Sequence, residues 1–353
     1  MMYKTNILLQ PFLLLVDIIG YFFFFWLKFM KLGEPKRILL IRLEHIGDVL
    51  MTTPTFRALR KRFPKAQIDV LVRDFAAPVV QKNKNISNVI VWNAPWLSRL
   101  GRREPWASVQ QMIRKLRKNK YDVAIDFHGD PRNILFASRI ARYRIGFGCR
   151  GFGFLLNKVV PYGKKHMIDR NLSLAKALGA DTSDRRMELQ LSPADERFAK
   201  SALKGITRPV CISIGSGKKE KNWLEERWAE VADSLIEKYN ATIILTGGKG
   251  DAEIVNSLQN RIQHKEKVLN LCGKTSLFQL AAVIKYCKLL LSPDSGPVHI
   301  ARTMNTPLLE LCFLDDPKEW GYNEPKFQNI KRNKPGEISP DDVLQKISQM
   351  KVL

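Results

Sequence analysis

The chain has 353 residues, which is enough for about two domains of ordinary size. Hydrophobic residues make up 45% of it and charged residues 26%, and this composition excludes a mostly disordered protein. The formal net charge is +24 and the pI about 9.9, so we expect an anionic partner: nucleic acid, a phospholipid surface or a phosphorylated substrate.

An apolar segment runs from Ile7 to Met30. At about 1.5 Å per residue, a helix of this length could roughly span a bilayer. Asp17 would then lie near mid-span, where a carboxylate is costly, so a helix lying in the interface is a competing interpretation. No small-residue cleavage motif precedes Lys31, and we therefore do not expect a cleaved signal peptide.

The aromatic run at residues 21–26 is followed by several basic residues: Lys28, Lys31, Lys36 and Arg37. This order is typical of a membrane boundary whose basic side faces the cytoplasm. The alternative is a buried helix of a soluble fold, which four consecutive phenylalanines fit poorly. We interpret residues 1–35 as a hydrophobic membrane-anchor segment.

Residues 36–190 are predicted to form an N-terminal α/β domain. Strand patterns occur at 36–43, 68–73, 88–92 and 121–127, with a loop and helix over 44–63 and a helical spacing from Val109 to Leu116. Alternating strands and helices imply a parallel sheet, and such sheets bind ligands beyond the carboxyl ends of their strands. Asp48 and Asp126 fall at those ends.

Asp48 follows Gly47 on the first strand-to-helix turn. A carboxylate at a helix N-terminus usually caps the helix, and the functional alternative is a general base aimed into a cleft. Asp126 and His128, in the motif DFHGD, are expected to shape their loop or contact substrate rather than perform chemistry. A lone histidine is more often a structural hydrogen-bonding residue.

Basic side chains crowd this half of the chain. Residues 99–120 carry eight of them against one acid, and residues 131–150 carry five arginines, Arg132 among them, with no acid. Charge runs are usually solvated faces. Because an apolar anchor lies in the same chain, anionic lipid headgroups or a phosphorylated glycolipid fit better than nucleic acid, for which no recognition motif is present.

Residues 191–335 are predicted to form a second α/β domain, and residues 336–353 a closing helix. Three of its strands end in polar or glycine-rich turns, around Ser216 and Gly217, around Gly247 and Gly248, and at SPDSG, residues 292–296. None is a Walker motif or a clean G-x-G-x-x-G fingerprint. On one side of one sheet, the three turns together would suit a nucleotide diphosphate.

The SPDSGP turn leads into a short helix. Asp294 and Ser295 are expected to cap its first N–H groups, and Gly296 allows close approach of a ligand. A turn of this kind is a natural anion site, although a well-capped helix of any α/β protein is the alternative. Lys221, just past the first glycine-rich turn, could offset charge on a diphosphate leaving group or be an ordinary loop lysine.

The five cysteines are scattered and lack C-x-x-C spacing. We expect reduced thiols in a cytoplasmic compartment, mostly filling cores. No residues are assigned to a metal.

Several stretches carry a resemblance to a known family. They include ILLIRLEHIGDVLMTTPTFRALRKRFP (38–64), YDVAIDFHG (121–129), KNWLEERWAEVADSL (221–235), LTGGKGDAEI (245–254) and SPDSGPVHIARTMNTPLLELCF (292–313). In this order and separation, the chain resembles glycosyltransferase family 9, the lipopolysaccharide heptosyltransferases, from Arg37 to about Pro325.

The resemblance implies a GT-B architecture: two Rossmann-like, doubly wound α/β domains facing across a cleft, here with an N-terminal hydrophobic helix added. It implies a metal-independent inverting glycosyltransferase without a cofactor, whose nucleotide-sugar, typically ADP-heptose, is a substrate held by the C-terminal domain. The acceptor would be a growing lipopolysaccharide-core glycolipid. This places the chain at the inner membrane, with the catalytic domains on the cytoplasmic side and no nucleic-acid partner.

The family's base carboxylate falls on Asp48 and its phosphate-binding lysine on Lys221. Donor-binding positions fall on Ser216, Gly217, Gly247, Gly248, Glu253, Asp294, Ser295, Gly296 and His299. Asp126, His128 and Arg132 are the candidates for acceptor binding.

The chain departs from the family's pattern at Gly217, where a hydroxyl is common, and at Leu224, where proline is usual. These departures put the sugar in doubt more than the reaction. Three alternatives stay open: transfer from a different nucleotide-sugar, a nucleotide-sugar epimerase of the same architecture, and a non-catalytic membrane assembly subunit.

Overall fold

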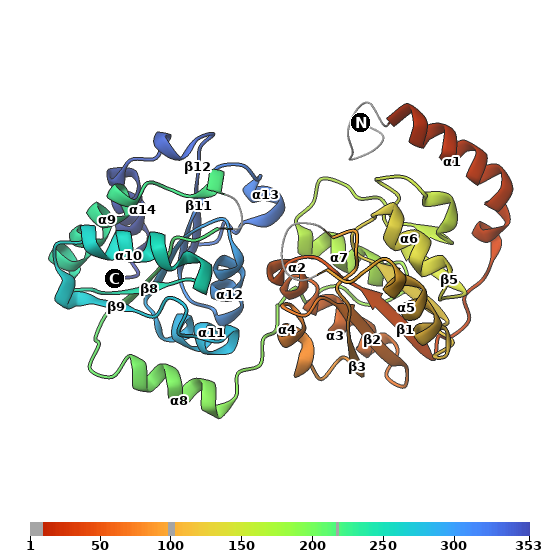
Figure 1. Cartoon of the computed structure of the whole chain (residues 1–353), viewed down its shortest axis with the longest axis horizontal. Coiled ribbons are helices and arrows are strands. Elements are labelled where there is room, and N and C mark those ends of the chain that lie inside the picture. The colour runs from red at the N-terminus through yellow and green to blue at the C-terminus, as the bar shows by residue number, and fades with distance from the viewer. Residues whose placement is uncertain (1–9, 98–102, 217–218) are drawn as a thin grey trace. The chain divides into compact units, whose positions relative to one another are not determined.

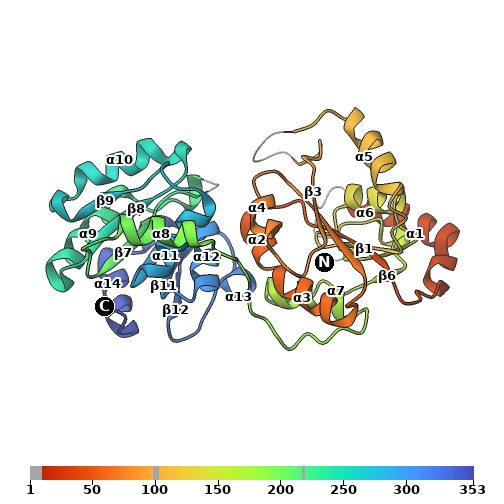
Figure 2. The same ribbon diagram turned by 90° about the horizontal axis from the view of Figure 1, so that it is seen from below.

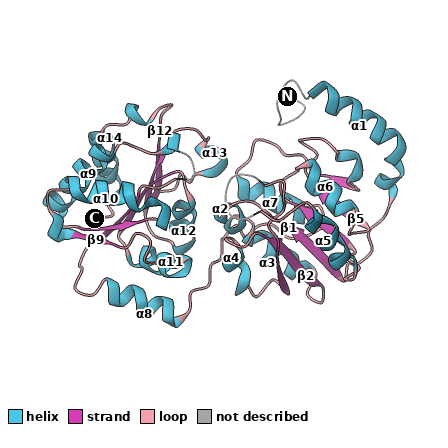
Figure 3. Ribbon diagram, in the orientation of Figure 1, coloured by secondary structure: helices cyan, strands magenta, loops and turns pink. Residues whose placement is uncertain are grey.

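The structure, a computed structural model, describes residues 10–97, 103–216 and 219–353 (Figure 1). The chain divides into two compact units, Met1–Glu188 (unit 1) and Leu189–Leu353 (unit 2). Each unit is built on one six-stranded sheet with helices packed around it (Figure 3).

The sheet of unit 1 is parallel and has the strand order β3-β2-β1-β4-β5-β6. Its strands are β1 (Arg37–Ile41), β2 (Gln67–Val72), β3 (Asn88–Val91), β4 (Val123–Asp126), β5 (Tyr143–Gly146) and β6 (Lys158–Val159). The central strands β1 and β4 are almost continuously apolar, as expected when both faces of a parallel sheet are covered. In their register Ile41 lies opposite Asp126, so the residues that follow β1 and β4 emerge side by side.

The helices of unit 1 after the N-terminal segment are α2 (Ile46–Leu50), α3 (Thr53–Arg62), α4 (Ala77–Gln81), α5 (Ala107–Arg117), α6 (Pro131–Ser138) and α7 (Met167–Lys176), with the 3-10 turn η3 (Gly153–Leu155). The pattern over 44–63 thus forms two helices rather than one. Pro54 stands in the first turn of α3, where its missing N–H and fixed φ favour a new helix start.

The sheet of unit 2 is also parallel, with the order β12-β11-β10-β7-β8-β9. Its strands are β7 (Pro209–Ser213), β8 (Thr242–Thr246), β9 (Val268–Asn270), β10 (Leu289–Pro293), β11 (Leu308–Cys312) and β12 (Phe327–Lys331). Because β10, β7 and β8 are adjacent and parallel, the three polar turns that follow them lie at one edge of the sheet, as predicted.

The helices of unit 2 are α8 (Pro193–Ala202), α9 (Glu225–Tyr239), α10 (Ala252–Arg261), α11 (Leu277–Tyr286), α12 (Gly296–Met304), α13 (Pro317–Trp320) and α14 (Pro340–Met350), with the 3-10 turns η4 (Lys219–Lys221), η5 (Lys249–Asp251), η6 (Lys265–Lys267) and η7 (Pro335–Glu337). The closing helix predicted near the C-terminus is confirmed as α14. Ser339 and Asp342 form a reciprocal capping box at its start.

The apolar N-terminal segment forms α1 (Gln10–Phe24), continued by the 3-10 helix η2 (Phe25–Phe29). By length and composition alone, Gln10–Phe29 could cross a membrane. Its helix lies at the outer edge of unit 1, on the side of α6 (Figure 1, Figure 2).

Candidate functional site

Asp48 is the third residue of α2, and only 8% of it is exposed. Its Oδ1 accepts a 2.7 Å hydrogen bond from Nη2 of Arg42, and its Oδ2 accepts one of 3.1 Å from the backbone N–H of His45. The second bond belongs to a capping box, so Asp48 has the capping role that was the alternative to chemistry. A carboxylate offers about four lone-pair sites, and these two partners leave room to accept a proton.

Arg42 is buried and joins Asp48 to a second carboxylate, that of Glu44. Its Nη1 lies 3.5 Å from Oε2 of Glu44. Oε1 of Glu44 in turn lies 2.7 Å from Nδ1 of His128, and Nη1 of Arg150 lies 2.7 Å from Nε2 of the same ring. The turns after β1 and β4 are thereby tied into one charged network.

The charges of this network shift the pKa values of Glu44 and His128. Burial alone would raise the pKa of Glu44, but His128 and Arg42 outweigh burial and lower the pKa to about 2. Burial opposes a charge on His128, yet Glu44 overcomes it and raises the pKa of the imidazole. Sequence reasoning missed Glu44, although its position directly after a buried strand was a usable signal.

Asp126 holds the turn after β4 in shape. Its Oδ2 accepts a 2.6 Å hydrogen bond from the N–H of Gly129, and its Oδ1 accepts one of 3.1 Å from Asn133. Burial raises the pKa of Asp126 to about 6, while His128 nearby opposes that shift. Arg132 makes a two-pronged contact with Asp130, at 2.9 and 2.6 Å, with its guanidinium about half exposed.

In unit 2, the turns after β7 and β8 meet around Asp251. Oδ2 of Asp251 accepts a 2.7 Å hydrogen bond from the N–H of Gly248, and a Cβ added to Gly215 would collide with the same carboxylate. A Cβ on Gly247 would lie 2.9 Å from that of Asp251. Close packing therefore requires glycine at Gly215 and Gly247. Asp251 is a residue that sequence reasoning missed.

Lys221 joins this region to the turn after β10. Its Nζ donates to Oδ2 of Asp294 at 2.5 Å and also pairs with Asp315. Burial disfavours the charge on Lys221, but Asp294 and Asp315 raise the pKa of its ammonium group. The lysine is thus held between two acids that stand beyond β10 and β11, and it is not an ordinary loop lysine.

The start of α12 departs from the predicted capping. Ser295 is the N-cap residue, but its side chain makes no cap hydrogen bond and lies 2.9 Å from the hydroxyl of Ser292. Asp294 faces Lys221 instead, because the ion pair attracts its carboxylate more strongly than a neutral backbone N–H would. A Cβ added to Gly296 would meet no atom within 4 Å, so open space adjoins this turn.

The other predicted donor residues are His299 and Glu253 on helices, Ser216 in the turn after β7, and Gly217. His299 is buried on α12, with Nδ1 3.0 Å from the hydroxyl of Tyr322. Glu253 is exposed in the first turn of α10, and Ser216 donates a 2.6 Å hydrogen bond to Asn222. Gly217 lies outside the described residues.

Glu310 is a further buried acid at this edge of the sheet. It lies on β11 opposite Ser292 of β10 and is 1% exposed. Burial, with the charge of Asp294 added, raises the pKa of Glu310 to about 8. Across residues 10–97, 103–216 and 219–353, no group of three or more His, Cys, Asp or Glu is placed to hold a metal ion.

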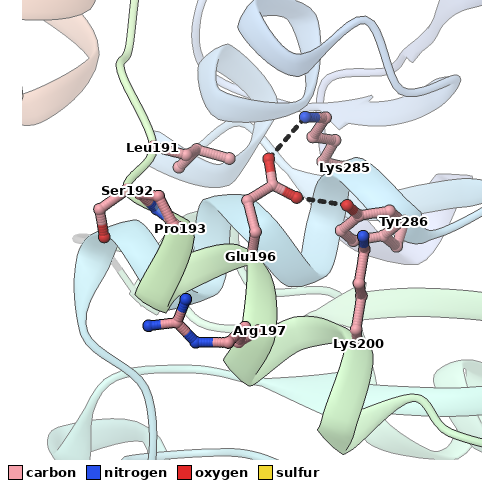
Figure 4. Close-up of a pocket in the computed structure, with 8 residues that line it drawn as sticks. All are labelled: Leu191, Ser192, Pro193, Glu196, Arg197, Lys200, Lys285 and Tyr286. Carbon is pink, nitrogen blue, oxygen red and sulfur yellow. Dashed lines mark hydrogen bonds and ion pairs between the residues drawn. The ribbon is translucent and has the colours of Figure 1, made fainter.

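A surface pocket of unit 2 lies elsewhere, between α8 and α11 (Figure 4). Glu196 occupies its centre, 2.6 Å from Nζ of Lys285 and hydrogen-bonded to the hydroxyl of Tyr286. None of its lining residues belongs to the predicted site.

Two sets of groups are therefore built at strand ends. Unit 1 carries a carboxylate fixed by an arginine, with a Glu–His pair beside it. Unit 2 carries three converging turns, a lysine and the open start of a helix, an arrangement that favours a diphosphate.

The family model described as glycosyltransferase family 9 (heptosyltransferase) matches residues 109–346. The lipopolysaccharide core heptosyltransferase OpsX of Haemophilus influenzae is 28% identical over 292 residues, which cover 80% of each chain.

Solved structures share the fold. A glycosyltransferase family 9 protein of Veillonella parvula has a TM-score of 0.79 and 25% identity, over 91% of this chain and 98% of its own. The E. coli heptosyltransferase WaaC, solved with ADP-2-deoxy-2-fluoro heptose, has a TM-score of 0.70 and 22% identity, over 89% and 99%.

The chain belongs to glycosyltransferase family 9, and the expected GT-B fold class is confirmed. It is a glycosyltransferase by family.

Proposed function

We propose that the chain is an inverting glycosyltransferase that moves heptose from ADP-heptose to a lipopolysaccharide-core or related glycolipid acceptor. The observation that carries the proposal is the set of three turns after β7, β8 and β10, joined through Asp251 and through the Lys221–Asp294 pair. The similarity to OpsX, and the ADP-heptose analogue bound by WaaC, support the choice of sugar and nucleotide.

In this reaction the hydroxyl oxygen of the acceptor attacks the anomeric carbon of the sugar. The bond from that carbon to the diphosphate breaks, and the configuration inverts. Asp48 takes the proton of the hydroxyl, and Arg42 keeps its carboxylate oriented. Lys221 and the N–H groups that begin α12 stabilise the charge on the departing diphosphate.

The glycolipid acceptor places the reaction at the cytoplasmic face of the inner membrane. The apolar stretch Gln10–Phe29 and the net charge of +24 support attachment to an anionic membrane surface. The reaction as proposed needs neither a metal nor a cofactor, because lysine and backbone N–H groups can stabilise the leaving group.

A thermal-shift panel of ADP, UDP, GDP and CDP tests the donor assignment. A ligand present at about 100 times its Kd adds roughly 2.7 kcal/mol to the free energy of unfolding, which is readily measured. We expect selective stabilisation by ADP. Selective stabilisation by UDP or GDP would instead indicate another nucleotide-sugar, and no stabilisation by any of them would contradict the proposal.

A further inference from the structure

The helix α1 and its continuation η2 are docked along the side of unit 1. The carboxylate of Asp17 accepts a 2.7 Å hydrogen bond from the backbone N–H of Phe152. At the other end, Nζ of Lys28 donates to the carbonyl of Gly153 at 3.1 Å and also to that of Leu156. Both charged side chains of the segment thus bind backbone groups in or next to η3.

Apolar contacts fill the same face between these two anchors. The ring of Phe24 packs on that of Phe154, with centroids 5.6 Å apart. A Cβ added to Gly20 would collide with the Phe154 ring, so glycine at this position allows the close approach of helix and turn. Leu27, the last buried residue of the face, is 4% exposed.

The opposite face is apolar and exposed. Phe22 is 75% exposed and Phe29 76%. The other large apolar side chains of the segment that are about half exposed or more are Phe12, Leu15, Ile18, Ile19, Phe23, Phe25 and Trp26. Exposing a continuous apolar surface of this kind to water is unfavourable. The surface therefore indicates that this face contacts an apolar environment.

The docked face restricts the orientation in which the segment can bind a membrane. From Asp17 to Lys28 the helix follows unit 1 over about 16 Å, at roughly 1.5 Å per residue. A helix crossing the bilayer would have to leave η3, stranding the Asp17 carboxylate and the Phe152 N–H, or else draw the turn into hydrocarbon. A helix lying in the plane of the interface keeps its docked face in contact with η3 and places its exposed apolar face in the lipid.

We propose that α1 and η2 form an in-plane membrane-docking element, fixed side-on to unit 1, whose exposed aromatic face enters the interfacial layer of an anionic phospholipid bilayer without crossing it. Charge supports this partner. Lys31 is exposed just after η2. Arg139 and Arg142 are exposed in the stretch that ends beside Gly151, whose added Cβ would touch Leu13 of α1. The inference rests on the proposed membrane attachment and not on which sugar is transferred.

Vesicle binding tests the lipid-facing surface. The full chain is sedimented with vesicles of phosphatidylethanolamine and phosphatidylglycerol. Phe22→Ser and Phe29→Ser should each weaken binding roughly tenfold, since each removes a large side chain from the apolar phase. Trp106→Ser, which alters an aromatic residue of unit 1 that is 66% exposed, is the matched control and should bind as wild type.

Failure of the wild-type chain to bind these vesicles would contradict membrane attachment itself. Equal binding by the two phenylalanine variants and wild type would contradict the assigned face.

Topology separates an in-plane helix from a spanning one. An epitope placed before Met1 is exposed to protease in inside-out inner-membrane vesicles, whose cytoplasmic face is outward. We expect the epitope to be cleaved together with the catalytic units, because an in-plane helix leaves both on one side. Protection of the epitope in membranes that bind the protein would overturn the in-plane proposal and leave attachment intact.

Docking on unit 1 is tested without any membrane. Gly20→Leu makes the segment more hydrophobic but forces a side chain against Phe154, so we expect a lower Tm in mild detergent. Ile19→Leu, on the exposed face, should leave the Tm unchanged. A spanning helix free of unit 1 would tolerate both substitutions equally.

Discussion

Asp48 is held by one guanidinium and one backbone N–H, and these two hydrogen bonds fix the position of its carboxylate. The asparagine variant keeps the shape of the side chain and loses the ability to accept a proton. We expect Asp48→Asn to bind ADP normally and to lose roughly 10²–10⁴-fold in turnover. Calorimetry with ADP checks the binding, and a transfer assay checks the turnover. Near-normal turnover would remove Asp48 from the mechanism.

Asp315 pairs with Lys221, the residue proposed to meet the donor diphosphate. Its negative charge also repels that diphosphate. We therefore expect Asp315→Asn to bind ADP several-fold more tightly, and more so at low salt, because the repulsion is removed while Asp294 still holds the lysine. The exposed acid Asp341 provides the control variant, Asp341→Asn. Weaker ADP binding by Asp315→Asn would mean that Asp315 positions the lysine.

Single residues show where sequence reasoning reaches its limit. Lys221 was singled out from the sequence, but its pairing with Asp294, 73 residues away, depends on which strands become neighbours. Glu44 was missed because its partner His128 follows a different strand. Asp48 was singled out by its place after a predicted strand, and the family resemblance gave it the role of base. The geometry of its carboxylate could be seen only in the fold.

At the scale of elements, short sequence patterns were sufficient to predict strands and helices that are determined by neighbouring residues. The strands β1 to β4 and β7 to β11 follow from apolar runs, and the capped helix α14 follows from a serine three residues before an aspartate. The strands β5, β6 and β12 were not predicted. The docking of α1 on η3 could not be predicted, since an apolar helix does not encode which surface it covers. The predicted capping by Ser295 was wrong, because a nearby serine and a lysine bind the side chains of this turn instead.

The β11 strand carries the buried Glu310, whose pKa of about 8 lies above the ordinary 4.5. The stability that this raised pKa contributes is fully present below about pH 4.5 and is lost as pH rises through about 8. Glu310→Gln removes the titration. We expect urea unfolding to show that the wild-type chain loses up to about 1.4 kcal/mol per pH unit across this window, relative to the variant. An exposed acid gives the control, Glu337→Gln, and parallel pH profiles for wild type and Glu310→Gln would contradict the assignment.

At the scale of the whole molecule, the two units divide the proposed reaction. The donor groups all belong to unit 2 and the base to unit 1. We expect ADP to slow hydrogen exchange in the turns after β7, β8 and β10 and to leave the turn after β1 unchanged. Exchange mass spectrometry of the full chain with and without ADP checks this. Protection centred on α2 would reverse the assignment of the units.

The central claim is transfer of heptose from ADP-heptose to a glycolipid acceptor, and an acceptor-dependence assay tests it most directly. The full chain is incubated with ADP-heptose, with and without heptose-deficient lipopolysaccharide core, and products are followed by mass spectrometry. We expect ADP release and an acceptor heavier by one heptose only when both substrates are present. An altered nucleotide-sugar formed without acceptor, as an epimerase would give, or an unchanged acceptor with intact donor, would contradict the claim.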